Sequence, residues 1–210
     1  TNGYLLNGST GVLSQITNDK VATVTILTGG SGYTNPVVTF SAPPSGVTAT
    51  GTVQLTSGVV TGVTITNPGL GYVIAPTVTI SDSGGGTGSG ATANCLLNFF
   101  PTGGITPGAV FLDTYIAVTT LSGRTYTSNV GDPTIWNPLD YITAEAEPDN
   151  SVGECKHLNY ILNFGQWSTE FFYDAANLTG SPLSSAPAYR LEIGCANGDS
   201  IVSFEQTVAW

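Results

Sequence analysis

The side chains best suited to chemistry are carboxylates gathered in one short stretch. Glu145, Glu147 and Asp149 lie at alternate positions, with Asp140 before them and Glu154 after them. Paired carboxylates can hydrolyse glycosides, and clustered carboxylates can bind Ca²⁺. However, Glu145 and Glu147 would share one face of a strand, and the stretch lacks the spacing of a calcium loop. We therefore expect a solvated edge or a subunit contact here, and no metal site.

The sequence also lacks the residue patterns of other kinds of catalytic site. His157 is the only histidine, so any catalytic triad would have to be built around it. No Gly-x-Ser-x-Gly elbow is present, and the serines lie mainly in turn-like segments. Glycines precede Tyr33 and Tyr72, but no following helix, lysine or basic field would make them a phosphate site. These absences predict a non-enzymatic protein with no cofactor and no small-molecule substrate.

Aromatic residues are more numerous and could form a sugar-binding platform. They concentrate in the second half of the chain, at Trp136, Trp167, Phe171, Phe172, Tyr173 and Trp210. An aromatic stripe at strand spacing is more often core or interface than a ligand shelf. We predict Trp136, Tyr141 and Phe172 as subunit-interface residues, together with the acidic turn that carries Glu145, Glu147 and Asp149.

Composition predicts an all-β protein. Charged residues make up 9% of the 210 residues, against about 25% in an average globular protein. Thr and Val are abundant, and 27 Gly and 12 Pro supply turns between short strands. The net charge of −10 includes only four basic residues, too few to grip a run of phosphates. DNA could therefore pass beside such a surface without being held tightly.

Three cysteines, Cys95, Cys155 and Cys195, are widely spaced and form no metal-ligand pattern. Free and mostly buried thiols fit assembly in a reducing cytosol, and one disulfide with a spare thiol is the alternative. No apolar stretch approaches the roughly 20 residues that a membrane-spanning helix needs.

The first half contains an internal repeat with an offset of 39 residues, measured from Gly32 to Gly71. Each copy has a Val-Thr-Ile strand, a Gly-Tyr element, a Pro-led strand and a third strand. Val24 and Val63 begin the equivalent first motifs, while Tyr33 and Tyr72 follow the glycines. We predict these four residues as core positions of a sandwich-like β-repeat module.

A Gly/Pro-rich break near residues 101–108 separates this module from longer strands beyond it. The strands there come at roughly ten-residue spacing with no helical period between them, which indicates a sandwich or a propeller-like arrangement. We expect two parts: residues 1–20 with 106–210, and an inserted module over 21–105.

The second half also resembles a known family. The resemblance is carried by an ordered series of segments: Asp132–Tyr141, Ala144–Asp149, His157–Tyr160, Phe164-Gly165, Ser168–Ala175 and Ile193–Ala196. The opening Gly3–Leu6 and Leu13–Thr17 also look like the strand pair that precedes Val110–Asp113 in that family. In order and spacing these segments resemble the packaged-DNA stabilisation proteins, or tail nozzle (tail hub) proteins, of short-tailed bacteriophages.

The resemblance implies a partial β-propeller-like module in a virion tail subunit assembled in the host cytoplasm. Such subunits form a ring, expected here to be hexameric, that extends the DNA channel below the portal and adaptor and helps retain and deliver the genome. Tail fibre or needle proteins are further possible partners. Residues 21–105 have no place in the family pattern, and their Gly-Tyr repeats resemble β modules of other phage virion proteins.

Two other functions fit parts of the sequence. A carbohydrate-binding tail-fibre, adhesin or capsid decoration module would use the aromatics and the Gly-Tyr repeats as its binding face. A secreted glycosidase fragment would use the Glu145 and Glu147 region. Residues 1–20 and 108–210 supply strands for only about two propeller blades, at about four strands each. We therefore expect further blades to come from sequence outside this chain or from neighbouring subunits.

Overall fold

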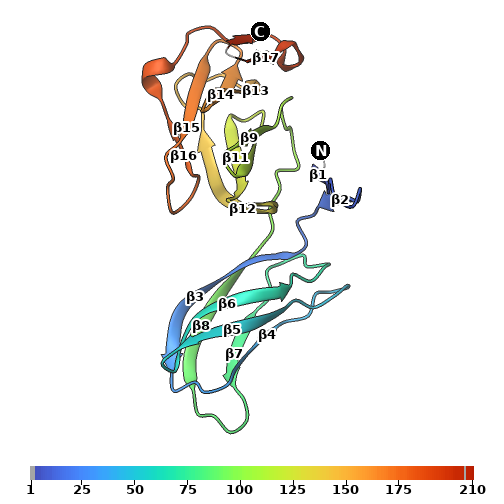
Figure 1. Ribbon diagram of the computed structural model, residues 1–210, viewed down its shortest axis with the longest axis vertical. Helices are drawn as coiled ribbons and strands as arrows, with labels where there is room; N and C mark the ends of the chain where they lie inside the picture. The colour runs from blue at the N-terminus through green and yellow to red at the C-terminus, as the bar shows by residue number, and fades with distance from the viewer. Residues whose placement is uncertain (1–2, 206) are drawn as a thin grey trace. The chain divides into compact units, whose positions relative to one another are not determined.

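The computed structural model describes residues 3–205 and 207–210, and strands dominate them (Figure 1). The chain divides into two compact units. We call Thr1–Ile16 with Phe100–Trp210 the meander unit, and Thr17–Phe99 the repeat unit. The predicted division at residues 20 and 106 stays a proposal about which segment was inserted. No helix in the described part of the chain is long and apolar enough to cross a membrane.

The meander unit is built from two four-stranded antiparallel sheets in which each strand pairs with the next in the chain. The first sheet contains β9 (Val110–Leu112), β10 (Tyr115–Thr119), β11 (Arg124–Asn129) and β12 (Asp132–Thr143). The second contains β13 (Ser151–His157), β14 (Tyr160–Gly165), β15 (Thr169–Asp174) and β16 (Leu183–Ser185). Four consecutive strands in one antiparallel sheet are the form of a propeller blade.

Short elements accompany these sheets. They are the hairpins β1 (Gly3–Leu6) with β2 (Leu13–Ile16) and β17 (Val202–Phe204) with β18 (Thr207–Ala209), and the 3-10 turns η1 (Pro187–Tyr189) and η2 (Gly198–Ser200).

One apolar core joins the two sheets. Leu112, Tyr115 and Ala117 of the first sheet pack with Ile161 and Phe172 of the second. Because side chains alternate across a strand, the next residues of β14 point the other way. There Leu162 and Phe164 form a separate cluster with Cys195. The second sheet is therefore covered on both faces.

A buried carboxylate also connects the sheets. Glu154 on β13 accepts hydrogen bonds from the Thr119 backbone N–H (3.0 Å) and from the Thr119 hydroxyl (2.8 Å) on β10. Thr119 then contacts Thr125 through their hydroxyls (2.8 Å), and the Asn163 amide donates to Thr125 (3.4 Å). Burial raises the pKa of Glu154 to about 8, and the two bonds from Thr119 act against that rise. We call Glu154, Thr119, Thr125 and Asn163 the polar seam, because burying such groups is costly unless they are hydrogen-bonded to one another.

The repeat unit pairs its strands differently. It contains β3 (Val21–Ser31), β4 (Pro36–Phe40), β5 (Thr50–Thr56), β6 (Val59–Asn67), β7 (Val78–Asp82) and β8 (Ser89–Leu97). Hydrogen bonds join β3 to β8, β4 to β7 and β5 to β6. These pairs also lie side by side, β3 against β6, β4 against β5 and β7 against β8, so the strands close a cycle.

The cycle encloses one core. Val38, Phe40, Tyr72 and Cys95 are buried in it, and the predicted core residues Val24 and Val63 pack against it half-buried, among others. The predicted sandwich-like module therefore takes the form of three strand pairs around a shared interior. At its ends the Asn98 backbone N–H donates to the Lys20 carbonyl (2.8 Å), so the entering and leaving segments lie together.

All three cysteines are free, with Cys95 and Cys195 buried and Cys155 half-buried. Burial raises the pKa of the Cys95 thiol to about 11. Burial, together with the neighbouring Glu154, raises that of Cys155 to about 11 as well. Both thiols therefore stay protonated at neutral pH.

Trp136 provides a test of the meander-unit core. Its side chain is 1% exposed, packs edge-on against Phe100 at 5.0 Å, and donates from Nε1 to the Pro133 carbonyl. We expect Trp136→Ala to lower the free energy of unfolding by about 3–5 kcal/mol, because it leaves a large cavity. Trp167, at 74% exposed, is the matched control, and Trp167→Ala should change stability by less than about 0.5 kcal/mol. Urea unfolding followed by circular dichroism compares them, and equal losses would contradict the assignment.

Glu154 provides a test of the polar seam. Its pKa is higher in the folded chain than in the unfolded one, so folding favours the protonated acid. Its contribution to stability is full below about pH 4.5 and is lost as the pH rises towards 8, at on the order of 1.4 kcal/mol per pH unit. Glu154→Gln cannot ionise and keeps an acceptor for the Thr119 N–H. We expect its stability relative to the wild type to increase between pH 5 and pH 8, measured by denaturant unfolding at each pH. Parallel pH profiles of the two proteins would show that Glu154 is not held in this way.

Candidate functional site

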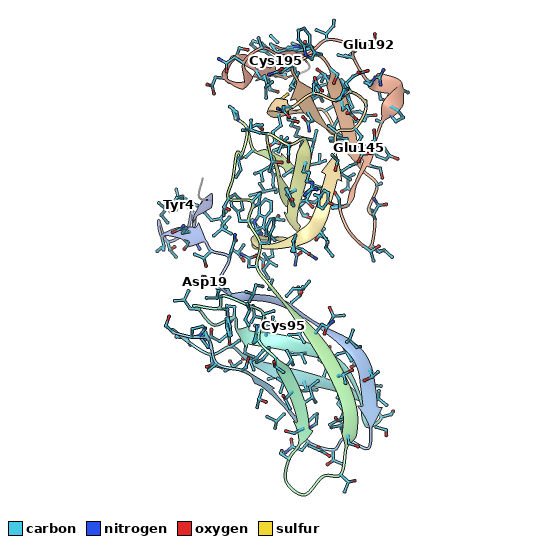
Figure 2. The ribbon with its side chains drawn as sticks, turned by 180° about the vertical axis from the view of Figure 1, so that it is seen from behind. Tyr4, Asp19, Cys95, Glu145, Glu192 and Cys195 are labelled. Carbon is cyan, nitrogen blue, oxygen red and sulfur yellow. The ribbon has the colours of Figure 1, made fainter. Side chains whose placement is uncertain are left out.

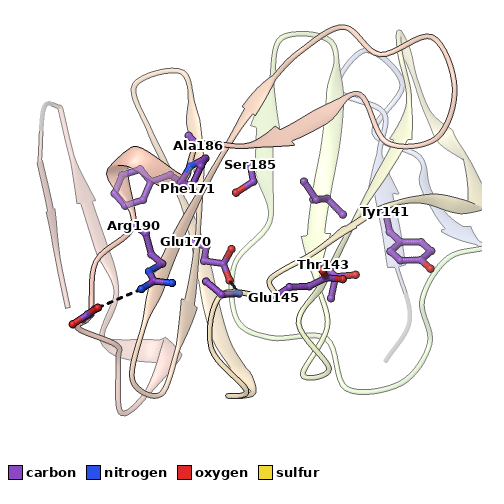
Figure 3. A pocket seen from close by; sticks show the side chains of 12 residues that line it. Tyr141, Thr143, Glu145, Glu170, Phe171, Ser185, Ala186 and Arg190 are labelled. Atoms are coloured by element: carbon purple, nitrogen blue, oxygen red, sulfur yellow. Dashed lines mark hydrogen bonds and ion pairs between the residues drawn. The ribbon is translucent and has the colours of Figure 1, made fainter.

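A groove of about 870 Å³ lies in the meander unit where the outer strands of the two sheets meet (Figure 3). The end of β12 contributes Tyr141 and Thr143, and Glu145 follows it. Glu170 and Phe171 come from β15 of the second sheet. The remaining wall includes Ser185, Ala186, Pro187, Arg190 and Glu192, from β16, η1 and the segment after it. The groove therefore depends on both sheets.

Three glutamates, Glu145, Glu170 and Glu192, and one arginine, Arg190, line the groove, so its charge is mainly acidic. The Arg190 guanidinium lies 3.3 Å from the Glu192 carboxylate and 3.8 Å from that of Glu147. These partly exposed pairs hold the loop after η1 against the acidic turn, but each contributes little to stability. They place Glu147 at the rim of the groove.

Glu170 is the deepest charged group of the groove, only 7% exposed. Its Oε1 accepts the Ala146 backbone N–H at 2.8 Å, which fixes the turn after β12 to the second sheet (Figure 3). Burial raises the pKa of Glu170, while the Ala146 hydrogen bond and the charge of Arg190 act in the opposite direction. A carboxyl group held in this way is a structural link between the two sheets.

Tyr141 forms the other end of the groove. The Arg124 guanidinium lies 4.7 Å from the centre of the Tyr141 ring, a cation–π contact, and the ring also packs against Tyr126 at 5.2 Å. Two of the four basic residues of the chain, Arg124 and Arg190, therefore lie beside this one surface.

The structure brings part of the predicted interface set together. Tyr141 and Glu145 line the groove, and Glu147 reaches it through Arg190. In Figure 2, Glu145 and Glu192 are labelled on the same side of the meander unit.

Three other predicted interface positions have structural roles inside the unit. Trp136 and Phe172 are buried in its interior, at 1% and 0% exposed. A side chain with no exposed surface cannot touch a neighbouring subunit, so we correct these two to core residues. Asp149 accepts hydrogen bonds from the backbone N–H groups of Trp167 (2.7 Å) and Ser168 (3.2 Å) and so anchors the turn before β15.

Nothing in this arrangement assembles a reaction centre. Glu145 is exposed, and the carboxyl group of the neighbouring Glu147 is paired with Arg190. His157 has a buried Nδ1 with no hydrogen-bond partner and stands apart from the groove lining. Within residues 3–205 and 207–210, no group of three or more His, Cys, Asp or Glu side chains could hold a metal ion.

Sequence reasoning missed Glu170, Arg190 and Glu192. Glu170 was hidden inside an aromatic strand, where alternation separates it from Phe171 but places it on the same face as the buried Phe172. Arg190 carried one available signal, since it is one of only four basic residues in the chain and Glu192 follows two positions later.

Comparison with known proteins agrees with the two-sheet architecture. No curated protein matches the chain. A family model described as the β-propeller of bacteriophage P22 Gp10 matches residues 89–210, which include all eight strands of the two meander sheets as well as β8. The match covers more than half of the 210 residues. The family consists of non-enzymatic structural proteins, which excludes the glycosidase alternative. The chain therefore belongs to the P22 Gp10 family of phage DNA-stabilisation tail proteins, and is a structural component of the virion tail.

Proposed function

We propose that this chain is a subunit of a ring that extends the DNA channel of the tail below the portal and adaptor, and helps retain and deliver the packaged genome. The observation that carries the proposal is the pair of consecutive four-stranded sheets within the matched family region. Each has the form of a propeller blade, and propellers typically contain four to eight blades. Two blades leave their outer sides free to meet further blades of the assembly.

The charge distribution supports a conduit. With a net charge of −10 and four basic residues, the chain cannot neutralise many phosphates. Two of those four residues, Arg124 and Arg190, are already engaged at the groove with Tyr141 and with glutamates. DNA sliding past such a surface would meet little electrostatic retention, as rapid ejection requires.

The groove supplies a candidate contact between subunits. Its rim carries exposed Glu145 and half-exposed Glu147 beside Arg190 and the Tyr141 ring, and tyrosine and arginine are common anchors of interfaces. In this proposal neighbouring subunits meet at this surface. Portal, adaptor, and fibre or needle proteins meet the ring at its two ends.

Microscopy of the purified full-length protein tests the ring. We expect closed rings, sixfold in projection, in negative-stain images and a matching mass by light scattering. Trimers would instead favour a fibre or adhesin, and monomers at micromolar concentration would exclude a self-assembling ring.

Charge reversal tests the groove as the contact. We expect the double variant Tyr141→Ala, Glu145→Lys to weaken subunit association about tenfold or more, because it removes an aromatic anchor and inverts a rim charge. Glu205→Lys changes an exposed glutamate of the β17–β18 turn by the same charge and is the control. Sedimentation velocity over a concentration series measures the association. Equal weakening by the two changes would assign the effect to net charge and remove the groove from the interface.

Deletion tests the place of the repeat unit. The ends of this unit are hydrogen-bonded to each other at Lys20 and Asn98, so its removal spans a short gap. We propose that this unit, which forms most of the insert predicted over residues 21–105, projects from the outside of the ring, away from the DNA path. Replacing the unit by a short Gly/Ser linker should then leave ring formation intact. Loss of rings in a variant that still shows the β circular-dichroism signal would make this unit part of the conduit.

A further inference from the structure

The two repeats of the repeat unit hold each other together. Repeat 1 comprises β3, β4 and β5, and repeat 2 comprises β6, β7 and β8. Every hydrogen-bonded strand pair of the unit joins one strand from each repeat: β3 with β8, β4 with β7, and β5 with β6. Among the described residues, no sheet joins two strands of the same repeat. Neither repeat alone can therefore provide hydrogen-bond partners for the backbone N–H and C=O groups of its strands.

The pairing has an internal twofold pattern. Exchanging the repeats turns β3–β8 into β6–β5 and maps β4–β7 onto itself, so the set of pairs is unchanged. The packing of β3 on β6, and of β4 on β5 with β7 on β8, is also preserved. The unit is thus built as a symmetric two-component complex whose components share one chain.

The two tyrosines of the Gly-Tyr elements obey the same pattern. The hydroxyl of Tyr33 in repeat 1 accepts the backbone N–H of Ala91 in repeat 2 at 3.2 Å. The hydroxyl of Tyr72 in repeat 2 accepts the backbone N–H of Ala49 in repeat 1 at 2.8 Å. Both tyrosines are 3% exposed, so these bonds lie inside the module. Each tyrosine anchors the start of the third strand of the other repeat.

The preceding glycines allow this close approach. Gly30 and Gly69 have φ of +61° and +71°, in the left-handed region, and they occupy equivalent positions before the two tyrosines. A Cβ atom at Gly30 would collide with the Ser89 carbonyl of repeat 2, and one at Gly69 would lie 2.7 Å from the Val47 carbonyl of repeat 1. The glycine requirement is therefore set by the other repeat.

A single tight turn keeps the repeats in one chain. Thr56 and Val59 form the last strand pair before it, and only Ser57 and Gly58 lie between them. Both have positive φ, +51° and +78°, as the two central residues of a type I′ hairpin turn require. If this turn opens, the contacts between the repeats are lost within one chain, but the same contacts can form between two chains.

We propose that repeat 1 binds repeat 2 of a second copy of this chain, with the same strand pairs and the same two tyrosine bonds, so that the repeat unit can join two chains by exchange. An exchanged pair contains the contacts of the closed unit, and the balance between the two forms is set by the effective concentration of neighbouring copies. Because the strand pairs and the two tyrosine bonds lie between repeats, the proposal does not depend on the ring.

Cleavage of the full chain at the turn tests this binding directly. A protease site inserted between Ser57 and Gly58 divides the protein into two parts after folding. We expect both parts to elute together in size-exclusion chromatography at low micromolar concentration. After mixing with tagged cleaved protein, a tag on the first part should be recovered with untagged second parts. Separation of the cleaved parts, or parts that never exchange, would overturn the proposal.

Variants identify the surface that holds the cleaved parts together. Tyr33→Phe with Tyr72→Phe removes both acceptors and leaves the Ala91 and Ala49 N–H groups without these partners. We expect the dissociation constant of the cleaved parts to rise about tenfold or more for each tyrosine. Tyr4→Phe, at an exposed residue of β1, is the control and should leave it unchanged. Unchanged binding in the double variant would place the contact outside the repeat faces and refute the assignment.

Shortening the turn gives a second measurement. Deletion of Ser57 and Gly58 prevents β5 from turning back onto β6 within one chain, so the repeats can pair only between chains. We expect dimers or larger closed oligomers by light scattering, with the circular-dichroism spectrum of the parent. A folded monomer would overturn the proposal. If the shortened chain does not fold, the cleaved protein decides the question.

Discussion

Backbone hydrogen bonding between antiparallel strands is the constraint on which this chain depends. Charged residues are scarce, and the described residues contain no α-helix that could satisfy its own backbone. Each strand must therefore find a neighbour, and the two units find neighbours in different ways. In the meander unit the neighbour is the next strand in sequence. In the repeat unit β3 pairs with β8, which is the last strand of the segment.

This difference sets how each unit can fold. A meander closes short turns one after another, so its loop-closure cost is low. The β3–β8 pair joins Val21 to Leu97, so the cycle of strands is complete only when β8, the last strand of the unit, has paired. Topologies dominated by such distant pairs fold slowly. The β5–β6 hairpin, closed by a two-residue turn, is the local pair from which folding of the repeat unit can begin.

Much of this architecture could be read from the sequence, because composition and alternation report directly on strands. The all-β class, the family and the 39-residue repeat all depended on patterns that lie along the chain. The errors concerned which face of a strand is covered. Alternation placed Phe172 and Tyr173 on opposite faces of β15, but only the packing of one sheet on the other shows that Phe172 is the buried one.

The candidate site was predictable only in part for the same reason. Tyr141 and Glu145 stood out as an aromatic and an acid beside a turn. Glu170, which lines the same groove, lies on β15 of the second sheet, and Arg190 lies in the loop after η1. No local sequence signal links β12 to either segment. The hydrogen bond between Glu154 and Thr119 could not be predicted from the sequence either, because a glutamate in a polar stretch gives no sign that it is fully buried.

The protonated thiols have a consequence for how the chain responds to oxidation. A thiol with a pKa of about 11 exists as thiolate in only about one molecule in ten thousand at pH 7. Thiolate is the form that air and disulfides oxidise, so Cys95 and Cys155 react slowly under oxidising conditions. Cys95 and Cys155 therefore contribute little to slow oxidative damage of the chain.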